Sequence, residues 1–339
     1  MKQRIVATAL MAAVAGGCMG SRGQPGGGGP KPNAIPTGNV KLPPPPPPPK
    51  FVSIDQGLRR DAEAELSKSF SSGDPVVRAN AIEATQKISG VSGAPRLIAA
   101  LTDPAAPVRF AGAMACGTLK LQAAKDRLLT MTGDRNVSVQ VAVRFALHRL
   151  GDTRLSHDFE LLSKDPSASV RANTALALGL LNEPSATNIL RPMLADTDRK
   201  VRMQVVESMY RLGDDEARNK LVVGSVSVFP DEQIICVLAL AGPKKPDVMR
   251  YLRAALTAEA PETRLAAARA VGMLGSDDGM TIALKAVDNK DARQRSMAAL
   301  ALGDIGRTDA QDELKDLLRD KEPAVRLAAA AAVLQLKAG

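Results

Sequence analysis

The sequence repeats with a 31-residue period over most of its length. Starting at Arg78 and moving along the chain by this period, seven of the nine positions reached are arginine and two are glutamine. No insertion or deletion interrupts the period, which is the signature of a protein built by stacking one small structural unit. We call the nine residues the ladder positions: Arg78, Arg109, Gln140, Arg171, Arg202, Gln233, Arg264, Arg295 and Arg326.

Each ladder position lies in a segment with the pattern of an amphipathic helix. Ala stands six residues after the ladder position in eight of the nine repeats, and Leu or Ile stands ten residues after it in eight. These positions fall on one face of a helix. The small Ala predicts close contact with a neighbouring helix, because a larger side chain would overpack the contact. Pro243 replaces the Leu in the sixth repeat, which is the most degenerate unit.

Each repeat also contains an earlier apolar helix and a turn between the two helices. In five repeats an Asp lies six residues before the ladder position, where its side chain can bond the turn amides or cap the second helix. A single helical hairpin cannot bury its apolar face, so such units stack on one another. The sequence therefore predicts an all-α protein, a right-handed α-solenoid of about nine hairpins over residues 51–339.

The order of Asp, Val-Arg six residues later and an Ala- and Leu-rich helix ending near Leu-Gly resembles HEAT repeats, most closely in residues 165–179. The short unit is similar to the HEAT-like repeats of the phycobilisome-lyase type. This resemblance implies that each ladder Arg bonds to the Asp of an adjacent turn; a phosphate-binding stripe is the alternative. No polar capping repeat follows the last helix, 327–336, so we expect that end-to-end association is possible.

Residues 1–17 resemble the signal peptide of a bacterial lipoprotein. A short basic start precedes an apolar stretch that is too short to cross a bilayer, and small residues lead to Cys18. The resemblance implies that Cys18 is lipidated, and that Met19 beside it favours the outer membrane, facing the periplasm. The alternative is an ordinary signal peptide with Ala13-Val14-Ala15 as its cleavage site.

Residues 18–50 form a Gly/Pro-rich linker with seven consecutive prolines, a composition that cannot bury a core. We interpret it as a spacer; a Pro-rich ligand for an aromatic groove is the alternative. The chain has a net charge of +9, but residues 1–50 hold six basic residues and no acid, which leaves +3 for residues 51–339. With aromatic residues at 2% and no Trp, the composition also argues against nucleic acid as a partner.

We find no pattern that predicts a catalytic, cofactor or metal site. Phosphate-binding loops, nucleophile elbows and H-E-x-x-H pairs are absent from the sequence. Cys116 and Cys236 fall on core faces as small hydrophobic residues. Deoxyhypusine hydroxylase, which uses similar repeats, holds iron with His-Glu pairs, and neither His148 nor His157 precedes a Glu. We predict a non-enzymatic protein without cofactors. An enzyme or cofactor-attachment factor like the phycobilin lyases is the alternative.

A second face of the predicted helices, opposite the core, carries an unusual share of apolar residues. Large exposed apolar patches mark interaction sites, so we predict a scaffold of the bacterial cell envelope, anchored by lipid, that binds a protein or an extended peptide along its concave face. The alternative is burial of the same residues between neighbouring helices. The candidate partner-binding groove consists of Phe110, Met114, Phe145, His148, Arg149, Leu176, Met203, Tyr210 and Arg211.

The lipid anchor is directly testable. Cells that express the protein and are fed a radioactive fatty acid should incorporate label into the wild-type chain, and Cys18→Ser should abolish this labelling because the acceptor thiol is removed. Equal labelling of the two proteins would contradict lipidation at Cys18.

Overall fold

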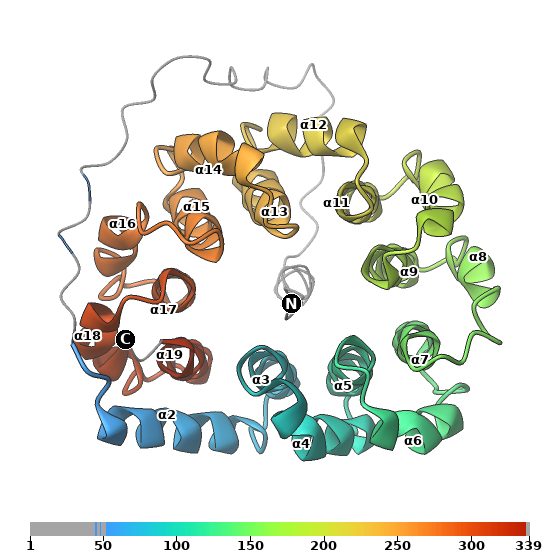
Figure 1. The fold of residues 1–339 in the computed structure, drawn as a ribbon, viewed down its shortest axis with the longest axis horizontal. Coiled ribbons are helices and arrows are strands. Elements are labelled where there is room, and N and C mark those ends of the chain that lie inside the picture. Colours follow the sequence, from blue (N-terminus) through green and yellow to red (C-terminus); the bar gives the residue numbers. More distant parts are fainter. Residues whose placement is uncertain (1–44, 46–47, 49–51, 337–339) are drawn as a thin grey trace. The chain divides into compact units, whose positions relative to one another are not determined.

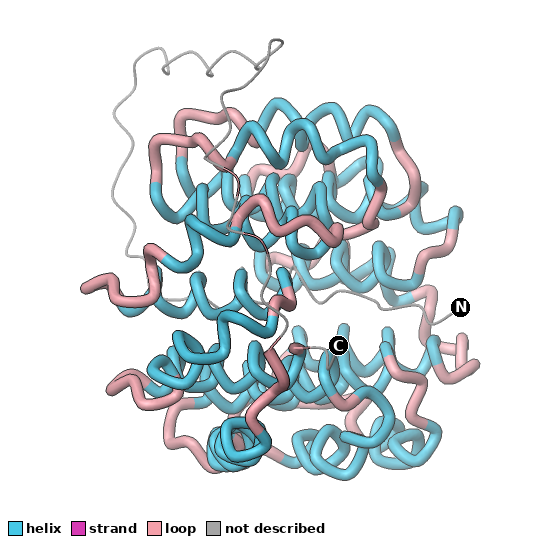
Figure 2. Tube along the Cα trace, turned by 60° about the vertical axis from the view of Figure 1, so that its left-hand side comes forward, coloured by secondary structure: helices cyan, strands magenta, loops and turns pink. Residues whose placement is uncertain are grey.

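The computed structural model describes residues 45, 48 and 52–336. These residues form eighteen α-helices, α2 to α19, joined by loops and short 3₁₀ turns, and none of them forms a strand (Figure 2). The predicted all-α class is confirmed. Among the helices described, none has both the length and the apolar character needed to cross a membrane. The predicted signal peptide, Cys18 and nearly all of the predicted linker lie outside the described residues.

Nine of the helices carry the ladder positions, and each begins three residues before its ladder position. The 31-residue period of the sequence is therefore a period of the structure. These second helices of the repeats are α3 (Pro75–Ile88), α5 (Ala106–Thr118), α7 (Val137–Arg149), α9 (Ala168–Leu181), α11 (Arg199–Arg211), α13 (Pro230–Ala241), α15 (Pro261–Met273), α17 (Ala292–Ile305) and α19 (Pro323–Gln335).

The first helices of the repeats are shorter, apart from α2 and α12. Seven of them contain five to seven residues, and several follow directly on a 3₁₀ turn. They are α2 (Gln56–Ser69), α4 (Ala94–Ala99), α6 (Lys125–Thr130), α8 (Asp158–Leu162), α10 (Thr187–Met193), α12 (Asp215–Gly224), α14 (Met249–Ala255), α16 (Met280–Leu284) and α18 (Gln311–Leu317).

The described chain forms two compact units. One consists of residues 70–218, and the other combines residues 52–69 with residues 219–336, so the chain passes between the units twice. Within each unit the second helices pack on one another in one layer and the first helices cover them in a second layer (Figure 1). This two-layer stacking of helical hairpins is that of an α-solenoid.

The starts of the second helices are set by local chemistry. The side chains of Asp74, Asn136, Asp198 and Asp291 each accept a hydrogen bond from a backbone N–H of the first helical turn. These bonds satisfy donors that have no partner inside the helix. Other second helices have Pro in their first turn, where a missing N–H costs nothing.

Neighbouring second helices approach closely at small residues, as the repeated Ala predicts. A Cβ added to Gly117 of α5 would lie 2.6 Å from Ala146 Cα of α7 and 2.8 Å from a ring carbon of Phe145. Gly303 of α17 meets Ala332 of α19 in the same way, at 2.7 Å from its Cα. A larger side chain at these points would push the two helices apart.

The predicted core residues include the two described cysteines. Cys116 and Cys236 are free thiols with no exposed surface. Burial raises the pKa of the Cys116 thiol to about 12, because the thiolate would lose its hydration. The thiol therefore stays protonated and packs as a small hydrophobic side chain.

The last helix is covered by another helix, although no capping repeat follows it in the sequence. The first of the described helices, α2, packs on α19 within the unit that contains both. Leu58, Ala62 and Leu66 of α2 are at most 4% exposed. The side chain of Arg326 in α19 also donates to Glu65 of α2. The sequence did not indicate this cap because it comes from the other end of the repeats.

The close approach of α5 and α7 yields a prediction for stability. Gly117→Ala should lower the free energy of unfolding by about 1–3 kcal/mol, because the new methyl group must displace Ala146 or Phe145. Gly133→Ala is the matched control, since no atom lies within 4 Å of its added Cβ. Urea unfolding compares the variants, and an equal effect of the two substitutions would contradict the packing argument.

Candidate functional site

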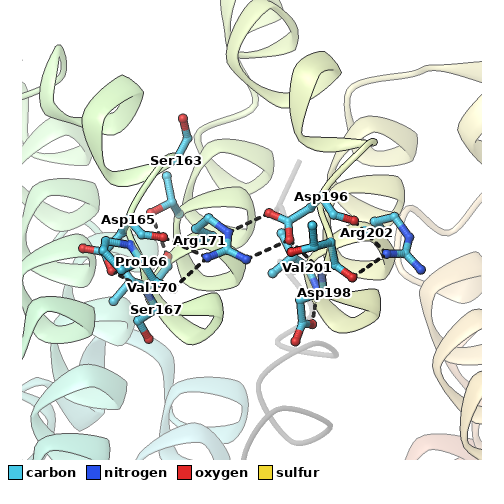
Figure 3. A network of polar contacts seen from close by, with 12 residues as sticks. Ser163, Asp165, Pro166, Ser167, Val170, Arg171, Asp196, Asp198, Val201 and Arg202 are labelled. Atoms are coloured by element: carbon cyan, nitrogen blue, oxygen red, sulfur yellow. Dashed lines mark hydrogen bonds and ion pairs between the residues drawn. The ribbon is translucent and has the colours of Figure 1, made fainter. Parts of the chain in front are cut away.

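The ladder arginine of the fourth repeat shows the polar contact that recurs along the stack (Figure 3). Arg171 Nε donates to Asp196 Oδ2 at 2.6 Å, and its Nη2 donates to Asp196 Oδ1 at 2.8 Å. Its Nη1 donates to the backbone oxygens of Asp165 and Pro166 at 2.8 and 3.0 Å. One guanidinium therefore holds the turn of its own repeat and the turn of the next one.

We call this arrangement a rung, and four arginines form it in full. In each case the Asp lies 25 residues after the Arg. The Oδ1 atom of each Asp also accepts a hydrogen bond from the backbone N–H two residues further on. This second bond shapes the turn that precedes the next second helix. The four rungs are Arg78–Asp103, Arg109–Asp134, Arg171–Asp196 and Arg295–Asp320.

The rungs are well shielded from solvent. In all four, each charged side chain is at most 15% exposed. The hydrogen bonds from Arg171 lower the pKa of Asp196, and those from Arg295 lower the pKa of Asp320. Bidentate pairs with this geometry are stronger than single ion pairs on an open surface. These rungs therefore hold successive repeats together.

The remaining three ladder arginines lack an Asp at the corresponding position of the next turn. Arg326 is close to the end of the chain and donates to Glu65 instead, at 2.9 Å. Arg202 and Arg264 bond the backbone oxygens of their own turns, but no carboxylate among the described residues bonds them. Ser227 and Asn289 stand where the Asp would be. Four of the seven arginines are thus held by the Asp of an adjacent turn, as the resemblance implies, and Arg326 is held by Glu65 of α2 instead.

The two glutamines at ladder positions keep only part of a rung. Gln140 Nε2 donates to Asp134 O at 2.8 Å, and Gln233 Nε2 donates to Ser227 O at 2.5 Å. Gln233 Oε1 in turn accepts a hydrogen bond from Thr263 Oγ1 at 2.8 Å. The neutral amide therefore keeps the hydrogen bond to the turn of its own repeat, but it does not make the bidentate bond to an Asp that an Arg makes in a full rung.

The prediction of an exposed apolar groove is wrong for five of its six apolar and aromatic members. Phe110 is 9% exposed, and Phe145 and Tyr210 are 1% exposed. Met114 and Leu176 are also buried. The ring of Phe145 occupies the space that Gly117 leaves open on the neighbouring helix, so it belongs to the contact between α5 and α7. These five residues are part of the core.

Four residues of the predicted groove remain half-buried, and we call them the half-buried strip: His148, Arg149, Met203 and Arg211. Arg149 and Arg211 occupy the same position of their repeats, nine residues after the ladder position. The Nε atom of each is buried and has no hydrogen-bond acceptor among the described residues. Arg211 Nη2 donates to Glu207 at 2.7 Å. The two arginines therefore lie on one side of the stack with donors left over.

His148 connects three segments of the first unit. Its Nδ1 lies 2.6 Å from Ser156 Oγ, and its Nε2 lies 2.7 Å from Glu183 Oε1. Ser156 belongs to the loop before α8, and Glu183 follows α9, so the imidazole ties two turns of the outer layer to α7. Neither partner was predicted, because nothing in the 31-residue period relates them to His148.

The acidic and histidine residues near α8 serve as local contacts. Asp158 accepts a hydrogen bond from Arg144 Nε at 2.7 Å and pairs with His157 at 2.9 Å. Phe159, the next residue, is 1% exposed and belongs to the core. In the part of the chain that the structure describes, no group of three or more acidic, His or Cys side chains is placed to hold a metal ion.

The fold and its rungs define a helical-repeat protein of the solenoid class. A family model described as HEAT repeats matches residues 62–148, 158–223 and 281–338, which together exceed half of the chain. The chain belongs to the HEAT repeat family. The matches leave out residues 224–280, where the degenerate sixth repeat lies.

Individual proteins are similar to parts of the chain. A HEAT repeat-containing taxis protein of Halobacterium salinarum is 29% identical over 164 residues, which are 48% of this chain and 37% of that protein. The chain thus spans well under half of that relative.

Solved structures are similar at the level of the fold. The complex of CpcE and CpcF of phycocyanin lyase from a Nostoc species has a TM-score of 0.43 and 18% identity, covering 75% of this chain and 97% of that chain. Human deoxyhypusine hydroxylase has a TM-score of 0.39 and 16% identity, covering 83% and 97%.

The incomplete rung of Arg264 yields a prediction for stability and pH. Asn289→Asp should raise the free energy of unfolding at pH 7 by about 1 kcal/mol, because it supplies the carboxylate that the other rungs contain. Asn289 Oδ1 already accepts from the N–H of Asp291, so the turn suits an Asp. A rung Asp has a lowered pKa in the folded state; its contribution is therefore full above the ordinary Asp pKa of about 4 and is lost as the pH falls through the lowered value.

Urea unfolding between pH 2 and 7 measures this gain. Combining Asn289→Asp with Arg264→Gln is the control, since the new carboxylate then has no guanidinium to accept from. A gain of the same size in the control, or a gain that persists in acid, would contradict the formation of a rung.

Proposed function

We propose that this protein is a non-enzymatic scaffold that is anchored in the bacterial envelope by a lipid on Cys18 and binds a protein partner at the half-buried strip. The proposal of an anchor, and of the outer membrane facing the periplasm, is supported by the lipoprotein-like start and the acid-free Gly/Pro-rich spacer of residues 18–50. The spacer keeps the repeats at a distance from the membrane surface.

The observation that carries partner binding is the pair of incompletely bonded arginines, Arg149 and Arg211. A buried N–H without an acceptor destabilises a protein by roughly 1–3 kcal/mol, and a shift of these half-buried side chains toward an incoming carboxylate would relieve this penalty. Guanidinium groups are also suited to bidentate bonds with carboxylates. The chemistry of the strip therefore favours an acidic partner over an apolar one.

The spacing of the two arginines defines the partner more closely. They are two repeats apart, which corresponds to about 20 Å when neighbouring helices are ~8–10 Å apart. An extended peptide covers this distance with roughly six residues at ~3.3 Å each. Met203 lies on the same helix as Arg211, α11, and offers a flexible apolar contact. We therefore infer an extended segment with acidic residues about six positions apart.

Photocrosslinking in living cells tests this function. A photoreactive residue at Met203, followed by mass spectrometry, should identify a crosslinked protein partner. Reversing both charges of the strip, with Arg149→Glu and Arg211→Glu, should reduce the crosslinked product at least about tenfold, since carboxylates would then face carboxylates.

Arg127→Glu is the matched control, because Arg127 is an exposed arginine on the first helix α6 of the same unit. Circular dichroism establishes that each variant retains its helices. If both variants give the same amount of crosslinked product as the protein that keeps Arg149 and Arg211, the strip is not the binding site.

A further inference from the structure

The N-terminal segment of the second unit is held by the last repeat through two separate contacts. In the first, the side-chain amide of Gln311 in α18 bonds the backbone of residues 53–55: its Nε2 donates to Ser53 O at 3.2 Å, and its Oε1 accepts from Asp55 N at 3.0 Å. Ile54 between them is 7% exposed. This extended piece directly precedes α2.

The second contact is the face of α2 itself. Leu58, Ala62 and Leu66 are spaced by four residues, so they form one apolar stripe, and all three are buried. Beside this stripe, Arg326 Nε donates to Glu65 Oε1 at 2.9 Å, with the two side chains 19% and 14% exposed. The last repeat therefore recognises an amphipathic helix by its apolar stripe and by one charged pair.

Helix α2, which covers this face of the last repeat, is joined to the following helix by a short segment only. Residues 70–74 connect α2 to α3, and the chain passes from one compact unit to the other at residues 69–70. Gly73 in this segment has no atom within 4 Å of its added Cβ. All the contacts of α2 described above are non-covalent, so α2 of another chain can make them equally well.

We propose that the α18–α19 face is a helix-binding surface whose second occupant is α2 of another copy of this chain, so that two copies exchange residues 53–69 reciprocally. Such exchange creates no new type of contact, which makes it a low-cost route to a dimer. The pair of Glu65 and Arg326 selects the correct helix, because both charged side chains are largely shielded from solvent where they meet. This inference does not depend on the half-buried strip or on the lipid anchor.

Two charge-reversal variants distinguish the exchange of α2 between chains from the packing of α2 on α19 of its own chain. Glu65→Arg places two positive groups together, and Arg326→Glu places two negative groups together, so each variant alone loses its ion pair. In a mixture, the Arg at position 65 of one chain meets the Glu at position 326 of the other, and the remaining Glu65 meets the remaining Arg326. Reciprocal exchange therefore restores both pairs, whereas closure within a chain restores neither.

The experiment uses the full chain with Cys18→Ser, so that lipid does not affect its mass. Light scattering after size-exclusion chromatography measures mass, and hydrogen exchange measures the protection of α19. Each variant alone should show exchange at least about tenfold faster in residues 323–335. The equimolar mixture should form a species of twice the chain mass and regain the protection.

The chain that carries both substitutions is the matched control, because its reversed pair can form within one molecule or between two, and it should show the protection and the mass of the wild-type chain. Circular dichroism establishes that the single variants are folded. Wild-type protection in each single variant would overturn the role of the ion pair. A mixture that stays monomeric and unprotected would overturn the exchange of α2.

Discussion

The bidentate bond between a ladder arginine and the aspartate of the next turn fixes the alignment of two successive repeats at four of the nine ladder positions. In the rung of Arg171, one planar guanidinium bonds the turn of its own repeat and the carboxylate of Asp196 in the next turn (Figure 3). Because its donors have fixed directions, the two turns are held at a defined distance and angle. Asp196 also accepts from the N–H of Asp198, so the same side chain shapes the start of the next helix.

Most of the arginines at the ladder positions are bonded to carboxylates within the stack. Most of the apolar residues of the predicted groove are likewise buried, in contacts between helices. Phe145 fills the gap above Gly117, and Tyr210 is equally buried. What the second helices of the first unit leave accessible within the predicted groove is mostly polar: His148, Arg149 and Arg211. The binding surface that we propose here relies on guanidinium donors more than on apolar area, which is why we infer an acidic partner.

The contact of α2 with the last repeat solves the problem that every solenoid has at its ends, where one apolar face has no neighbour. Here α2 packs on α19, and Glu65 accepts the hydrogen bond from Arg326 that an aspartate accepts in the rungs. Because both partners in this contact come from one chain, a second copy presents the same two surfaces. The association that we propose therefore uses the same contacts as the packing of α2 on α19 within one chain.

The sequence by itself determined the helical hairpin and its period, because these depend on contacts that recur at fixed short separations. Helix starts and the small residues between helices follow for the same reason. The resemblance to HEAT repeats implied the rungs, in which the Arg and the Asp are always 25 residues apart. The tertiary structure alone decided two things. Phe145 is buried because a glycine of the neighbouring helix makes room for its ring. Arg326 meets Glu65 across 261 residues of sequence, and no local pattern relates two positions that only the folding of the whole second unit brings together.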